Sequence, residues 1–161
     1  MAIGGTLATF EDLQILKSAE AVADSVWKSV SRWDEFTKDV VGKQLTRAVD
    51  SIGANIAESF GRYGFGEKLQ FLYYARDSLF ETKYWLNRVR ERGLMKPDEV
   101  NAYVENLTQL ARQLNTFASG LKTVRAEQPA KKSVREPVPA YITSIDSEPL
   151  FSEEDLHLLT Q

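Results

Sequence analysis

Five polar side chains stand in stretches that are otherwise apolar, and their types could support chemistry. They are Asn55, Glu58, Arg62, Ser78 and Glu81. Asn55 and Glu58 are one helical turn apart, as are Ser78 and Glu81, so each pair shares a helix face. We interpret the set as a hydrogen-bonded network that fixes helix register, because buried polar groups need partners. Contact with a ligand or RNA, and catalysis, are the alternatives.

The rest of the sequence contains few residues that are typical of catalytic or metal sites. There is no cysteine, and the single histidine, His157, stands near the C-terminus. Di-metal sites in helical bundles use Glu-x-x-His pairs, which this sequence lacks. The glycines between Gly61 and Gly66 follow a helix pattern, whereas a phosphate-binding loop follows a strand. We therefore expect a protein that is not an enzyme and that has no metal or other cofactor.

Basic residues recur along the third predicted helix. Arg76, Lys83 and Arg90 are spaced by seven and form one stripe, which Lys68 and Arg88 flank. Phosphate groups bind to such arrays, and neighbouring aromatic rings can stack on bases. We predict that these five side chains bind nucleic acid. The alternative, which is favoured for a monomer, is a solvated helix face; several copies around one channel favour binding.

Hydrophobic periodicity predicts an all-α fold that positions these residues. Apolar residues recur every three or four positions in four segments. The predicted helices cover residues 10–30, from 37–41 to 61, 66–92 and 97–125. Residues 34–38 form a polar break, Gly61 and Gly64 suit a left-handed C-terminal cap, and Gly93 ends the third helix. Short connections predict an up-down-up-down antiparallel four-helix bundle.

The third predicted helix is apolar on more than one side. Beside its main stripe it carries Tyr73, Phe80 and Tyr84. A helix that is apolar on two sides is buried on two sides. In a small bundle, we interpret this second set as a subunit interface.

Composition divides the chain into four parts. Four of the five prolines follow residue 125. We predict a flexible arm at 1–9, the bundle at 10–125, a disordered Pro-rich linker at 126–149 and a short helix at 150–161.

The last twelve residues have the signals of a short amphipathic helix. Ser152 suits the N-cap, Asp155 follows three residues later, and Phe151 and Leu156 have the spacing of a hydrophobic staple. Leu156 and Leu159 give the helix an apolar face. Such a short helix is unstable alone. We expect Phe151, Leu156 and Leu159 to dock, on this protein or on a partner.

Charge and targeting signals limit where this chain acts. Residues 1–125 carry 17 basic and 16 acidic side chains, whereas residues 126–161 carry 3 and 7. An acidic tail therefore follows a near-neutral body. The N-terminus lacks the features of a secretory signal, and no apolar run approaches the roughly 20 residues that span a bilayer. We expect a cytoplasmic protein.

Two sequence signatures, Ala54-Asn55-Ile56-Ala57-Glu58 and Ser78-Leu79-x-Glu81-Thr82, are shared with a known family. With them stand Phe10-x-x-Leu13, Gln44-Leu45-x-Arg47-Ala48-x-x-Ser51-Ile52, Gly61-Arg62 and Phe71-Leu72-x-x-Ala75. Over about residues 10–121 the chain resembles the four-helix-bundle proteins encoded in 23S rRNA intervening sequences. That family also contains the accessory variability determinant of diversity-generating retroelements. Ser59 stands where the family usually has glycine.

The resemblance implies an up-down four-helix bundle that assembles as a homopentameric ring with a central channel and has no enzymatic activity. In the retroelement branch it also implies binding of nucleic acid and of a reverse transcriptase. Our first hypothesis is thus an oligomeric scaffold and accessory factor that binds structured RNA, a partner protein such as a reverse transcriptase, or both. The alternative is a protein–protein adaptor that acts through the C-terminal tail without binding nucleic acid.

Overall fold

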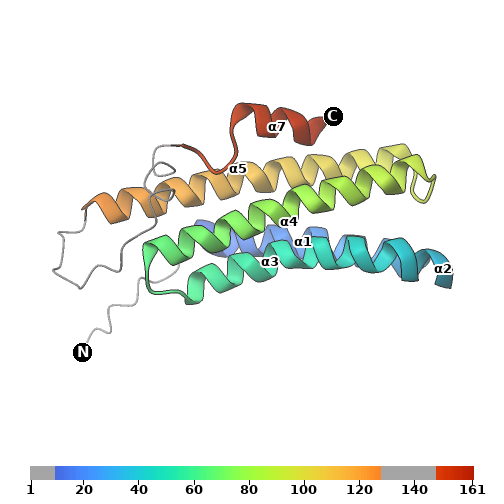
Figure 1. Ribbon diagram of the computed structural model, residues 1–161, viewed down its shortest axis with the longest axis horizontal. Coiled ribbons are helices and arrows are strands. Elements are labelled where there is room, and N and C mark those ends of the chain that lie inside the picture. Colours follow the sequence, from blue (N-terminus) through green and yellow to red (C-terminus); the bar gives the residue numbers. More distant parts are fainter. Residues whose placement is uncertain (1–9, 128–147) are drawn as a thin grey trace.

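The structure is a computed structural model, and it describes residues 10–127 and 148–161 (Figure 1). As predicted from the periodicity, this part of the chain is all-helical. The predicted flexible arm and almost all of the predicted linker lie outside the described residues. The helices are α1 (Phe10–Val30), α2 (Glu35–Thr37), the π-helix η1 (Lys38–Gly42), α3 (Lys43–Gly61), α4 (Phe65–Glu91), α5 (Pro97–Glu127) and α7 (Glu153–Thr160).

The four long helices lie lengthwise side by side, and each contacts two others (Figure 1). Helices α1 and α4 both pack against α3 and α5. Their apolar stripes meet in one core, in which the largest side chains are almost completely buried, such as Ile52, Leu72, Leu86 and Leu107. Burial of each such side chain contributes roughly 1.5–3 kcal/mol. Among the described residues, no helix is long and apolar enough to cross a membrane.

The connection from α1 to α3 is helical, although the sequence predicted a polar break there. Asp34 ends the break, because its carboxylate accepts hydrogen bonds from the backbone N–H of Thr37 at 3.0 Å and from the Thr37 hydroxyl at 2.6 Å. The hydroxyl contact, followed by the N–H contact, lowers the pKa of Asp34. Capped in this way, α2 continues into η1 and then into α3. The predicted start of the second long helix thus falls inside the π-helix.

Gly42 lets η1 approach α1 closely. A Cβ atom at this position would lie 2.7 Å from Cγ1 of Val30, inside van der Waals contact. Both residues are buried. The absence of a side chain at Gly42 is therefore a packing requirement at this corner.

The predicted left-handed cap at Gly61 and Gly64 is wrong. Arg62 ends α3 in an extended conformation, and Gly64 has a φ of −80°. Among the described residues, only Gly93 has a positive φ, of 65°. The Lys68 ammonium group replaces the glycine cap at α3, because it donates to the carbonyl oxygens of Ser59 and Phe60.

Gly93 ends α4 as the sequence predicts. Its N–H donates to the carbonyl of Arg90, and the N–H of Leu94 donates to the carbonyl of Val89, both at 3.0 Å. These two hydrogen bonds form a Schellman motif, which needs the left-handed conformation at Gly93. Helix α5 then begins at Pro97, which is also as predicted.

Three side chains join α1 to the start of α5 through buried and partly buried hydrogen bonds. The Ser29 hydroxyl donates to Glu99 at 2.6 Å and lies 2.9 Å from the Tyr103 hydroxyl. Tyr103 also donates to the backbone carbonyl of Ser25 at 3.1 Å. Because Ser29 and Tyr103 are buried, these contacts fix the relative position of two helices that are more than 70 residues apart in sequence.

The C-terminal segment, defined as residues 148–161, lies along α5 (Figure 1). Its short helix α7 begins with the predicted capping box. The Ser152 hydroxyl accepts from the N–H of Asp155, and the Asp155 carboxylate accepts from the N–H of Ser152. This element of the predicted tail is confirmed.

Candidate functional surface on helix α4

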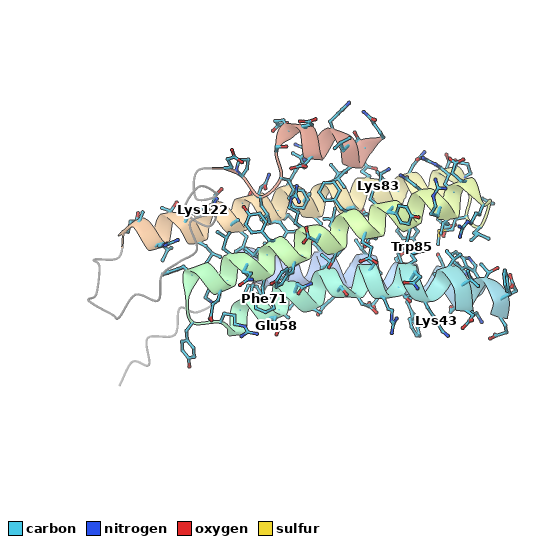
Figure 2. The ribbon with its side chains drawn as sticks, in the orientation of Figure 1. Lys43, Glu58, Phe71, Lys83, Trp85 and Lys122 are labelled. Atoms are coloured by element: carbon cyan, nitrogen blue, oxygen red, sulfur yellow. The ribbon has the colours of Figure 1, made fainter. Side chains whose placement is uncertain are left out.

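All five predicted nucleic-acid-binding cations lie on α4, but their surroundings differ. Figure 2 shows Lys83 and Trp85 well away from the α3–α4 corner, where Glu58 and Phe71 lie. Lys83 is only 6% exposed. Its ammonium nitrogen donates to Oδ1 of Asn87 at 3.1 Å. Burial, and after it the charge of Arg90, lowers the pKa of Lys83.

Arg90 shares the same acceptor. Its Nη2 lies 3.5 Å from Oδ1 of Asn87, while its Nε lies 3.8 Å from the carboxylate of Glu91. We name Lys83 and Arg90 the cation pair. The atom between them is a neutral amide oxygen, and the one carboxylate that pairs with either of them in the described residues is the largely exposed Glu91. Lys83 therefore has no carboxylate partner there, and a bound anion beside it would gain free energy.

One exposed and one partly buried aromatic ring lie next to the cation pair in the sequence of α4. Tyr84 is 54% exposed and packs edge-to-face against Trp85, with 5.1 Å between ring centroids. The Arg88 guanidinium lies over the Tyr84 ring at 6.0 Å. Aromatic and guanidinium planes of this kind are surfaces on which unpaired bases stack.

Arg76 has a different environment, because the C-terminal segment covers it. Its Nη2 contacts the Asp155 carboxylate at 3.1 Å. Its guanidinium also lies over the ring of Phe80 at 4.9 Å and over that of Phe151 at 5.7 Å. Burial alone would raise the pKa of Asp155, but the hydrogen bonds from Ser152 and Arg76 outweigh it and lower that pKa.

The Lys68 ammonium group stabilises the fold, because it donates hydrogen bonds to backbone carbonyls at the end of α3. The five cations therefore do not form one uninterrupted free stripe, because Arg76 is paired with Asp155 and Lys68 is bonded to backbone carbonyls. The structure brings Lys83 and Arg90 together through Asn87. Nucleic-acid binding by these residues stays a prediction.

The predicted polar network separates into two pieces. Asn55 donates to the Ser78 hydroxyl at 3.3 Å and so connects α3 with α4. Glu58 instead pairs with Arg62 at 2.9 Å on the surface. Glu81 is exposed, and no hydrogen bond or ion pair reaches it from residues 10–127 or 148–161. Within this predicted set, and among the residues that the structure describes, only Asn55 and Ser78 form a hydrogen bond between α3 and α4.

The predicted oligomer interface is also divided. Tyr73 and Phe80 are partly buried and pack against the core, whereas Tyr84 is largely exposed. The Phe80 ring lies 5.9 Å from the Phe151 ring. Part of the second apolar side of α4 is thus covered by the chain's own C-terminal segment.

The predicted docking residues Phe151, Leu156 and Leu159 are buried in this chain. The sequence left open whether this protein or a partner receives them, and in the structure the chain's own bundle does; docking on a partner stays a prediction. Asn115 on α5 makes the most specific contact. Its amide nitrogen donates to the carbonyl of Phe151 at 2.8 Å, and its amide oxygen accepts from the N–H of Phe151 at 2.7 Å.

Asn87 and Asn115 were not among the residues predicted from the sequence. Both are amides inside long helices, where asparagine is a poor helix former. The low helix propensity of asparagine was a usable signal that these side chains have another role. Asn87 accepts from Lys83 and Arg90 within α4, and Asn115 bonds to the backbone of Phe151. Their partners could not be read from spacing alone.

A cleft of about 500 Å³ between α1 and α3 has the opposite charge. Small residues such as Ala19 and Gly53 form its floor, and Glu20, Asp24 and Asp50 lie along it. Burial, followed by the charge of Asp24, raises the pKa of Asp50. This acidic cleft disfavours phosphate, in contrast to the cation pair on α4.

Comparison with protein-family models gives one match. Residues 11–116 fit the model of the 23S rRNA-intervening sequence protein. The chain belongs to this family. The matched region contains Lys83, Arg90 and Asn115 and ends before the C-terminal segment. The family assignment thus covers the bundle and gives it an RNA-related context, while leaving residues 148–161 outside. No curated protein matches the chain.

Proposed function

We propose that this member of the rRNA-intervening sequence family is a non-enzymatic scaffold that binds structured RNA. It is an up-down-up-down four-helix bundle that assembles into an oligomer, with a pentamer as the expected form, and it acts in the cytoplasm. It serves as an accessory factor for a partner protein, with a reverse transcriptase as the expected class.

The observation that carries the RNA proposal is the cation pair. Lys83 is buried next to Arg90, and the acceptor they share is the neutral amide of Asn87. Holding this charge costs free energy in the absence of an anion, and a backbone phosphate would recover it. The exposed Tyr84 ring beside Arg88 supplies a stacking surface for an unpaired base.

The oligomer proposal is supported by apolar side chains that are exposed in the described part of the chain. Trp27, Phe36 and Tyr84 are each more than half exposed. Native mass spectrometry tests it, with five times the 18.2 kDa chain mass as the expected result. A monomer would overturn the pentamer and would also favour the solvated helix face over RNA binding, so the affinity for RNA is measured separately.

RNA binding is tested by measuring the affinity of the full chain for a structured RNA at several salt concentrations. The variant Lys83→Gln/Arg90→Gln is expected to bind at least tenfold more weakly. The negative slope of log affinity against log salt is expected to become shallower by about 1–2. The matched control is Lys17→Gln/Lys28→Gln, which removes two exposed charges from α1. Equal losses in both variants would show only a general charge effect.

The adaptor without nucleic-acid binding remains the second candidate, because the C-terminal segment makes specific contacts. If the full chain binds no RNA or DNA at low salt but still binds partner proteins, the adaptor becomes the better proposal and the RNA-binding scaffold is rejected.

A further inference from the structure

The surface that receives the C-terminal segment has the properties of a peptide-binding site. We name it the tail site and define it by Arg76 and Phe80 on α4 and by Asn115 and Lys122 on α5. Each of these residues contacts the segment. The site lies on the two helices that pack against each other on one side of the bundle.

Asn115 recognises the main chain of the segment. It bonds both the N–H and the carbonyl of Phe151, which is the residue just before the N-cap of α7. One amide therefore satisfies two backbone groups that lie outside any helix. Such recognition fixes the direction and register of a bound peptide.

Arg76 and Phe80 recognise the side chains. The guanidinium of Arg76 pairs with Asp155 and also faces the ring of Phe151, which is 1% exposed. Leu150, Leu156 and Leu159 are buried as well. The bound pattern is therefore an aromatic residue, a carboxylate four residues later and leucines on the same side of a short helix.

The connection to the segment is much longer than this docking requires. The Lys122 ammonium donates to the carbonyl of Glu148 at 2.6 Å, so the segment begins beside a residue only five positions before the end of α5. Those five positions span roughly 7.5 Å of helix. The 20 residues from 128 to 147 can span up to roughly 66 Å. The covalent connection therefore permits docking on a neighbouring molecule.

We propose that the tail site is a peptide-binding site and that residues 148–161 of a second copy of this chain occupy it by exchange with the chain's own segment. Exchange preserves every contact at the site and so links copies without a new interface. The chain's own segment competes at an effective concentration on the order of millimolar. The inference does not depend on RNA binding or on the number of subunits in the proposed scaffold.

The test measures binding of a fluorescently labelled peptide of residues 148–161 to full-length proteins by anisotropy. The variant Phe151→Ala weakens the resident segment, and Asp155→Ala provides a second such variant. We expect the peptide to bind these chains at least tenfold more tightly than wild type. Adding Asn115→Ala should reduce that binding at least tenfold, whereas Asn106→Ala, an exposed asparagine on the same helix, should leave it unchanged.

Exchange between copies is tested in the same assay by competition. A full-length Asn115→Ala protein has an intact segment and a weakened site, so it should displace the peptide from the Phe151→Ala chain. The control competitor carries Asn115→Ala and Phe151→Ala together. If both competitors act alike, or if the peptide binds the variants no better than wild type, the proposal is overturned.

Discussion

Gly42 and Val30 are packed so closely that a single methyl group at position 42 would lie 2.7 Å from Val30 Cγ1. Val30 is β-branched, so its side chain cannot turn away as a long flexible chain could. The contact joins the π-helix to the end of α1. It makes this corner sensitive to a change that most helices tolerate.

We expect Gly42→Ala to lower the free energy of unfolding by about 1–3 kcal/mol, because overpacking outweighs the gain in helix propensity. Gly120→Ala is the matched control. Nothing lies within 4 Å of a Cβ at that exposed position in α5, so the same substitution should stabilise by up to about 1 kcal/mol. Urea denaturation measures both, and effects of equal sign would contradict the packing argument.

The buried hydroxyl of Tyr103 should contribute measurably to stability. Tyr103→Phe removes its bonds to Ser25 and Ser29 and leaves the ring in place. We expect a loss of about 1–2 kcal/mol, because the Ser25 carbonyl loses a donor. Tyr84→Phe, at a largely exposed ring, should change stability by less than about 0.5 kcal/mol. The comparison fails if the two variants unfold at the same urea concentration.

Lys83 is expected to oppose folding at neutral pH. Its pKa in the folded chain lies below the ordinary 10.5, so the unfolded chain binds more protons between these two values. Stability therefore rises as the pH increases through that window and is lowest, for this residue, below it. Urea denaturation from pH 8 to 11 should show this rise in wild type and lose the Lys83 contribution in Lys83→Met.

Lys83→Met should also separate stability from binding. Replacing a buried charge by an apolar side chain of similar length is expected to raise the free energy of unfolding at pH 7 by about 1 kcal/mol. The same variant should bind RNA more weakly. Lys17→Met, on an exposed position of α1, should change neither property. A variant at Lys83 that is both less stable and unchanged in binding would contradict the role of the cation pair.

Asp155 should make docking of the C-terminal segment sensitive to acid. Its pKa is lowered in the folded chain, so its contribution is fully present above the ordinary value of about 3.8 and is lost as the pH falls through the lowered pKa. We expect Asp155→Asn to weaken docking by about 1.5–3 kcal/mol at neutral pH. Hydrogen exchange of the Leu156 amide, which bonds to the Ser152 carbonyl, reports it. Glu153→Gln, at an exposed position, should leave this exchange rate nearly unchanged.

Much of the helical framework was predictable from local signals. The periodic apolar residues, Pro97 at the start of α5 and the Ser152–Asp155 capping box all act within a few residues of each other. The π-helix was not predictable in this way, and its close contact with α1 joins Gly42 to Val30, twelve positions earlier. The prediction of a glycine cap between α3 and α4 was wrong for a similar reason, because Lys68 of the next helix donates to a carbonyl oxygen at the end of α3.

The candidate site was predictable only in part. Spacing by seven placed Lys83 and Arg90 on one helix, and the structure adds that they share Asn87. Spacing could not predict that Arg76 meets Asp155, which lies 79 positions away. Long-range pairs of this kind depend on how a tail returns to the bundle, and no local pattern records that path.

The two oxygens of Asp155 have separate tasks. Oδ2 accepts the N–H of Ser152 at the start of α7, while Oδ1 accepts from Arg76 on the bundle. An eight-residue helix has little stability without such support. We therefore expect α7 to melt when the whole segment leaves the bundle, so that the released segment is an unfolded peptide. The rate at which a protease cleaves the segment would therefore be proportional to the fraction of molecules whose segment is undocked.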